Sequence, residues 1–149
     1  METHSYKVNL VWQHDRKGEL SSPVLPETIT VATPPEFPKG MAGIWSPEHL
    51  FVASINSCFM ATFLAVAEKS QLPFSSFCCE AEGVLGKNSE GKFSVTRVTL
   101  KPTVVVPEDQ TTERVQKILE TSEKACLISN SAKSEIVLEA NIVKTAAVV

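Results

Sequence analysis

The sequence predicts an α+β fold in which strands pack with two helices, in a single domain that spans residues 1–149. Apolar and polar residues alternate near the start, in the middle and at the end of the chain, as in strands with one buried face. Two other segments carry apolar residues at helical spacing. With 43% hydrophobic and 21% charged residues, the chain can bury a core and stay in solution.

The N-terminal region is expected to hold two strands and two irregular segments. Residues 6–12 alternate in polarity, which predicts a strand with one buried face. Residues 14–19 are polar with a glycine and predict a turn, whereas the β-branched run at 28–32 predicts a second strand. Residues 34–40 contain three prolines, which exclude regular strand pairing.

A long helix is predicted to begin at Ser46-Pro47-Glu48, which offers a serine cap, a proline at the first helical position and an acid in the first turn. It is expected to run to Ser70 and to stop before Pro73. Because this helix is apolar nearly all round, it should be buried on most faces. It therefore needs cover from a sheet, a second helix or a partner chain.

The second half of the chain predicts a hairpin, a helix and a last strand. The hairpin joins residues 74–85 to 93–106, with a bulge near Thr96-Arg97 where the polar alternation changes phase. A second helix is expected to open at Pro107-Glu108-Asp109, and the last strand covers 136–142. The apolar stripe of that helix is Val115, Ile118, Leu119, Ser122, Ala125 and Cys126, whereas Lys101, Arg114 and Lys117 should be solvated. The predicted order is β-β-α-β-β-α-β, with room for one more short strand.

Composition argues against several classes of partner. The net charge of −3 and the pI of about 5.6 give no basic excess that would attract nucleic acid or an anionic membrane. Residues 1–7 are polar and lack the apolar stretch of a signal peptide. The most apolar segment, 50–67, carries four polar residues and fits a buried helix better than a membrane span. A cytoplasmic protein is expected.

Four cysteines in such a chain are core thiols, metal ligands or redox groups. Cys58 falls in the middle of the long helix and Cys126 at the end of the second, both on apolar sides, so the two thiols could meet. A mid-helix thiol gains little from the helix dipole, and apolar surroundings raise its pKa, so a reactive Cys58 needs a nearby cation. Cys78 and Cys79 are adjacent on a strand, face opposite sides and are interpreted as structural.

Spacing alone favours inert core thiols over a catalytic pair, and it argues against a metal site. There is no Cys-x-x-Cys, and His4, His14 and His49 do not cluster with the thiols, so no metal and no bound cofactor is expected. A buried cysteine is often an inert small hydrophobe, which stays an alternative for both thiols.

Two motifs resemble those of one family, the OsmC/Ohr proteins (osmotically induced and organic-hydroperoxide-resistance proteins). The first is Ser46-Pro47-Glu48-His49-Leu50-Phe51, followed by Ala53-Ser54-Ile55-Asn56-Ser57-Cys58 and Thr62. The second is Cys126-Leu127-Ile128-Ser129-Asn130-Ser131. The resemblance covers nearly the whole chain. It implies two antiparallel sheets around a long buried central helix, and an intertwined homodimer.

The resemblance also implies a chemistry, the reduction of organic hydroperoxides by thiols. Cys58 would attack the peroxide, and Cys126 would resolve the product through an intramolecular disulfide. Arg16, with Lys17 as its rival, would supply the cation that favours the thiolate, and Glu48 would hold the guanidinium. The Gly-Gly-Arg run of the hydroperoxide-resistance branch is absent around Arg16.

Substrate, reductant and subunit arrangement follow as further expectations. Phe51, Phe59 and Phe63 would line an apolar site that suits an organic peroxide, although for each of them a place in the core is the favoured interpretation. An external dithiol, such as a lipoyl dithiol, would reduce the disulfide. Glu48 and Cys58 are ten residues apart, about 15 Å along a straight helix. Either the helix starts later than Ser46, or Glu48 and Arg16 come from a partner subunit. The alternative function is binding of a small apolar ligand, with weak or no peroxidase activity.

Overall fold

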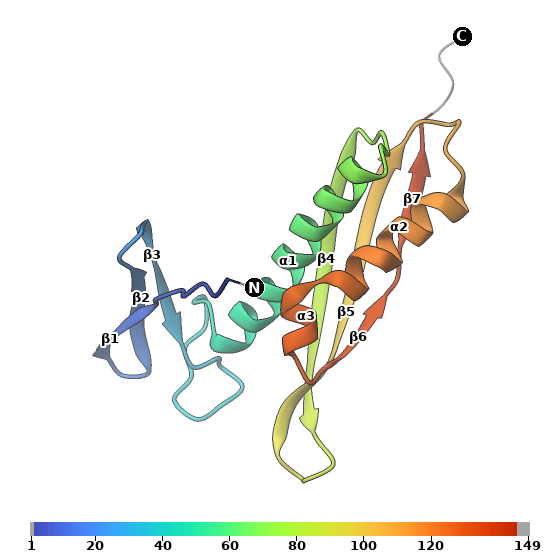
Figure 1. Cartoon of the computed structure of the whole chain (residues 1–149). Helices are drawn as coiled ribbons and strands as arrows, with labels where there is room; N and C mark the ends of the chain where they lie inside the picture. The colour runs from blue at the N-terminus through green and yellow to red at the C-terminus, as the bar shows by residue number, and fades with distance from the viewer. Residues whose placement is uncertain (1, 146–149) are drawn as a thin grey trace. The chain divides into compact units, whose positions relative to one another are not determined.

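The computed structural model describes residues 2–145 and contains two sheets and three helices in that range (Figure 1). The chain divides into two compact units, Met1–Phe51 and Val52–Val149, which are described separately below. The α+β prediction is confirmed. The observed order is β-β-β-α-β-β-α-α-β-β, which adds a strand in the first unit, a short helix and a division of the last strand.

The first unit holds an antiparallel sheet with the order β1-β2-β3, formed by β1 (Asn9–His14), β2 (Lys17–Ser22) and β3 (Leu25–Ala32). The turn between β1 and β2 occupies only residues 15–16, so the polar segment predicted as one long turn also provides β2. The sequence pattern did not predict β2, because its lysine and glutamate are residue types that also occur in turns.

One face of this sheet carries apolar side chains, several of which are exposed. Leu10, Leu20 and Ile29 lie opposite one another across the three strands. Leu10 is 62% exposed and Trp12 is 72% exposed. The prediction that the first strand buries one face is therefore wrong for the described residues of one chain, since all six residues of β1 are exposed.

α1 (Pro47–Lys69) begins where the sequence predicted. The buried Ser46 side chain accepts a hydrogen bond from the backbone N–H of His49 at 3.1 Å, which satisfies one free donor of the first turn. The Ser46 hydroxyl also lies 2.7 Å from His49 Nδ1. The helix ends before Gln71, whose φ of 54° is left-handed, as is common after the last helical turn.

Only one stripe of α1 is fully buried. It consists of Ile55, Phe59, Phe63 and Ala67, spaced four residues apart. Met60 and Leu64 lie off this stripe and are 45% and 42% exposed. Burial on most faces is thus not observed, because the chain supplies cover for one side. By length and composition α1 could cross a membrane, but its stripe packs in the protein core.

The second unit is built on a sheet in which β5 (Phe93–Val106) is central. β4 (Ser76–Lys87) pairs with it antiparallel, as predicted, and the register shift leaves Thr96 unpaired between Val95 and Arg97, where the bulge was expected. β6 (Glu135–Leu138) and β7 (Asn141–Lys144) both pair with β5 in parallel. This sheet is therefore mixed rather than antiparallel, because the connection from β5 to β6 crosses over through helices.

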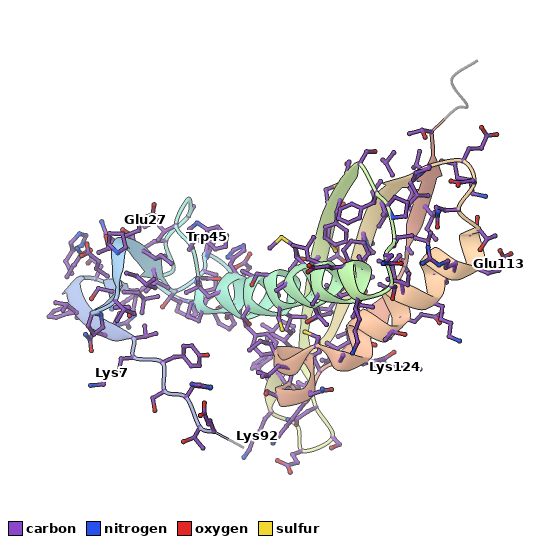
Figure 2. The ribbon with its side chains drawn as sticks, turned by 45° about the horizontal axis from the view of Figure 1, so that its top comes forward. Lys7, Glu27, Trp45, Lys92, Glu113 and Lys124 are labelled. Carbon is purple, nitrogen blue, oxygen red and sulfur yellow. The ribbon has the colours of Figure 1, made fainter. Side chains whose placement is uncertain are left out.

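Two helical segments follow β5 on the face where α1 also lies (Figure 1). α2 (Thr112–Ala125) is capped by Thr111 and begins after the turn at 107–110, later than predicted. Figure 2 shows Glu113 and Lys124 near its two ends. α3 (Leu127–Ser131) is a single short turn.

The buried face of α2 is Val115, Ile118, Leu119 and Ser122, which confirms most of the predicted stripe, whereas Ala125 is exposed. Arg114 was predicted to be solvated but is partly buried. Its guanidinium donates to the Gln110 side chain at 2.6 Å and to the Ser70 backbone oxygen, which ties α2 to the end of α1. The last carbonyl oxygens of a helix have no partner inside the helix, and Arg114 donates to one of them, at Ser70. The spacing of residues in the sequence does not predict this contact.

Candidate functional site

Cys58 lies in the middle of α1 and is a partly exposed residue. Thr62, one turn further on, donates a hydrogen bond to the Cys58 backbone oxygen at 2.8 Å. The hydroxyl of Thr62 lies 4.0 Å from Cys58 Sγ, which places a polar group beside the thiol. The spacing of four residues puts both side chains on one face of the helix.

Cys126 stands at the junction of two helices and has no exposed surface. It ends α2, where its N–H donates to the Glu123 oxygen at 3.2 Å, and it begins α3, where its C=O accepts from Asn130 N–H at 3.0 Å. Lys124, labelled in Figure 2, marks the end of α2 just before it. The chain changes direction at Cys126, whose extended backbone (φ −64°, ψ 116°) separates the two helices.

The structure brings the two thiols together, as the sequence suggested it could, and both cysteines are free. Burial acts to raise the pKa of Cys58, but hydrogen bonds from the Ile128 backbone, the Cys126 thiol, Thr62 and the Leu127 backbone outweigh it and lower that pKa. The pKa of Cys126 is raised by burial and by its interaction with Cys58, against a smaller opposing effect of Ser129. The pair is therefore polarised, with the partly exposed Cys58 the readier to ionise.

The source of this polarisation was not predicted. We expected a cation to be needed beside Cys58, because a mid-helix thiol gains little from its own helix. The donors are instead backbone N–H groups of α3, at Leu127 and Ile128. The first N–H groups of a helix have no internal partner, so those of α3 are free to donate to a sulfur, but no side-chain pattern in the sequence marks them.

Arg16, Lys17 and Glu48 belong to the first unit. Arg16 lies exposed in the turn between β1 and β2, Lys17 begins β2, and Glu48 lies in the first turn of α1. Within residues 2–145 neither Arg16 nor Glu48 forms an ion pair, so the pairing of the two is not made inside one chain. Because α1 does begin at Pro47, a late helix start cannot explain the separation of Glu48 from Cys58.

The predicted phenylalanines lie in different surroundings. Phe59 and Phe63 have no exposed surface. Phe63 stacks on Phe77 of β4 at 4.5 Å between ring centres and meets Phe74 edge-on at 5.2 Å. These two rings are part of the core between α1 and the sheet, which is the alternative that the sequence left open. Phe51 is partly exposed.

The remaining cysteines are separate from this site. Cys78 is exposed, whereas Cys79 is partly buried on β4, where burial raises its pKa to about 11. In the described part of the chain, no three His, Cys, Asp or Glu side chains gather as metal ligands would. We call the group of Cys58, Thr62, Cys126 and Ser129 the thiol site.

A polarised thiol pair, held between a long helix and the junction of two others over a mixed sheet, defines a thiol protein of α+β class. A family model described as OsmC-like protein matches residues 40–141. The chain therefore belongs to the OsmC-like family, and the resemblance of its two cysteine motifs is confirmed.

Individual relatives agree along nearly their whole length. The uncharacterized protein YmaD of Bacillus subtilis is 25% identical over 152 residues, which cover 95% of this chain and 97% of that protein. An OsmC-like protein of unknown function from Vibrio cholerae is 28% identical, with a TM-score of 0.85 over 93% of this chain and 99% of the other. An organic hydroperoxide resistance protein from Elizabethkingia anophelis has the same fold, with 20% identity and a TM-score of 0.77 over 97% and 99%.

Proposed function

We propose that this protein is a cytoplasmic thiol peroxidase that reduces organic hydroperoxides with Cys58 as the attacking and Cys126 as the resolving cysteine. The observation that carries the proposal is the polarised pair, in which hydrogen bonds lower the pKa of the partly exposed Cys58 while burial raises that of Cys126. A two-cysteine peroxidase needs the attacking cysteine to have the lower pKa, because the thiolate attacks the peroxide and the second thiol reacts only afterwards.

The cycle balances with these two thiols and one external reductant. The Cys58 thiolate attacks the terminal oxygen of the hydroperoxide, the O–O bond breaks, and the alkoxide takes up a proton to leave as an alcohol. Cys58 is then a sulfenic acid. Cys126 sulfur attacks it, forms the disulfide and expels hydroxide, which leaves as water with the proton of Cys126. A dithiol, of which a lipoyl dithiol is one example, then reduces the disulfide and is itself oxidised.

A homodimer supplies what one chain lacks. The sheet of β1–β3 and the outer side of α1 both leave apolar side chains exposed, and a second copy would cover them. In this arrangement Arg16, or Lys17 in its place, and Glu48 of the partner complete the site and stabilise negative charge on the reacting oxygen. Phe51 then contributes apolar surface beside the peroxide.

The first experiment counts thiols under denaturing conditions before and after one equivalent of cumene hydroperoxide. Wild type should lose two thiols rapidly, Cys58→Ser should lose none, and Cys126→Ser should proceed to over-oxidation of Cys58. Cys78→Ser serves as the matched control and should behave as wild type, because Cys78 lies outside the thiol site. Slow loss that does not depend on which cysteine is replaced would refute the peroxidase and favour ligand binding.

A further inference from the structure

Ser129 is a polar residue in the thiol site that the cycle above does not use. Its side chain is only 7% exposed, and within residues 2–145 its hydroxyl has no hydrogen-bond partner. Ser122, a buried serine of α2, shows the usual arrangement, since its hydroxyl donates to the Ile118 oxygen one turn back at 2.7 Å. A buried hydroxyl without such a partner is uncommon because its desolvation is not compensated.

The surroundings of Ser129 indicate which atom its hydroxyl serves. Ser129 follows Cys126 by three residues in α3, and its hydroxyl and backbone N–H both lower the pKa of the Cys126 thiol. In the reduced protein, however, that hydroxyl makes no hydrogen bond of ordinary geometry, to this sulfur or to another described atom. In the reduced protein the Cys126 proton is directed toward Cys58. A Cys126 sulfur that carries negative charge could instead accept the hydroxyl proton of Ser129.

Burial decides when Cys126 carries that charge. Cys126 has no exposed surface, whereas Cys58 is partly exposed, so a dithiol reductant can reach only the Cys58 sulfur of the disulfide. Its thiolate forms a new S–S bond with Cys58, the Cys58–Cys126 bond breaks, and Cys126 leaves with the electron pair as a thiolate. The rate of such exchange depends on how well the leaving thiolate is stabilised.

We propose that Ser129 is a positioning residue for Cys126, whose hydroxyl donates to the Cys126 thiolate when that sulfur attacks or leaves. This inference rests on the proposed two-cysteine function and assigns the reductive half of the cycle to an interaction inside α3. The mixed disulfide with the reductant therefore forms on Cys58.

The test follows reduction of a disulfide that is formed with diamide, so that no peroxide is needed. Stopped-flow reduction by dithiothreitol is compared for wild type, Ser129→Ala and the pair Ser129→Thr and Ser129→Val, which share a shape but not a hydroxyl. Ser131→Ala is the control, since the exposed Ser131 hydroxyl of the same helix bonds to the Leu127 oxygen at 3.0 Å. Loss of a hydrogen bond to a charged group should slow Ser129→Ala and Ser129→Val about 10-fold, with Ser129→Thr near wild type.

The possible outcomes distinguish failure of the Ser129 role from failure of the proposed peroxidase function. Equal reduction rates for wild type, Ser129→Ala and Ser131→Ala would overturn the role of Ser129 and leave the peroxidase standing. Equal rates for the Thr and Val variants would do the same. If neither diamide nor cumene hydroperoxide forms the Cys58–Cys126 disulfide, the proposed function fails and the role of Ser129 fails with it. Thermal unfolding of each variant checks that the fold is retained.

Discussion

Cys58 differs from the other three cysteines in the donors around its sulfur. The backbone of Leu127 and Ile128 and the side chains of Cys126 and Thr62 all favour its thiolate. Cys79 has a single such donor, from the backbone of Lys101, against stronger desolvation. For a single cysteine, the number of hydrogen-bond donors to the sulfur therefore decides whether its pKa is lowered or raised.

The first prediction concerns the alkylation of Cys58 by iodoacetamide. Because the thiolate is the reacting form, its rate in the folded protein should rise with a midpoint pH below that of the denatured chain. By linkage, this group stabilises the fold fully above its unfolded pKa, and that stability is lost as pH falls through the lower folded pKa. Mass spectrometry of the peptides separates Cys58 from exposed Cys78. Superimposable folded and denatured profiles would contradict the polarised pair.

The second prediction concerns Cys79 and alkaline pH. Burial raises its pKa to about 11, so the folded state holds the thiol proton after the unfolded chain has released it. The stabilising contribution is complete below the unfolded pKa of about 8.5 and is lost as pH rises toward the folded value. Urea unfolding of Cys79→Ala should show a shallower decline of stability between those limits than wild type shows. An unchanged slope for Cys79→Ala would show that another group titrates.

At the scale of elements, prediction succeeded where local chemistry sets the outcome. The start of α1 at Ser46-Pro47, the β4–β5 hairpin and its bulge at Thr96 follow from capping and alternation. β2 was missed because Lys17, Gly18 and Glu19 are residue types typical of a turn, although they lie in the central strand of this sheet. The split of the last strand into β6 and β7 depends on pairing with β5, which is a tertiary feature.

The loop at residues 34–40 gives a prediction at this scale. A Cβ on Gly40 would overlap the backbone oxygen of Pro34, which cannot move aside as a flexible side chain could. The close approach is fixed by hydrogen bonds from Phe37 N–H to the Pro34 oxygen and from Gly40 N–H to the Phe37 oxygen. Gly40→Ala should therefore lower the free energy of unfolding by about 2 kcal/mol or more, measured in urea.

Gly86→Ala is the matched control for that substitution. Its Cβ would meet only the Thr96 side chain, at 3.5 Å, in ordinary contact. The unfolding free energy of this variant should stay within about 1 kcal/mol of wild type. Equal destabilisation by both substitutions would mean that loss of glycine, rather than the contact with Pro34, matters.

For the whole molecule, the sequence predicted the thiol pair but could not predict what surrounds it. Family motifs identified Cys58 and Cys126, and their positions on two helices suggested contact. The amide donors of Leu127 and Ile128 could not be read from side-chain identity, because backbone groups are common to all residues. Arg16 and Glu48 were identified only by resemblance, and their ion pair is absent from the described part of one chain.

The last prediction tests whether a partner subunit completes the site. Cys58→Ser and Arg16→Ala chains should each be inactive with cumene hydroperoxide, the first without its thiolate and the second without its cation. If Arg16 acts across a twofold interface, a mixed dimer holds one site with both residues intact. Equal mixing after denaturation and refolding should then restore about a quarter of the wild-type rate, since half of the dimers are mixed and each has one complete site.

Two controls sharpen this result. A mixture of Cys58→Ser and Cys126→Ser chains should stay inactive, because the two thiols that form the disulfide are in contact within the second unit of one chain. The mixing experiment is repeated with Lys17→Ala in place of Arg16→Ala, to test whether Lys17 supplies the cation instead. Full activity of Arg16→Ala alone would remove Arg16 from the site. Two inactive variants that stay inactive when mixed, although native mass spectrometry shows mixed dimers, would place Arg16 and Cys58 of the same chain in one site.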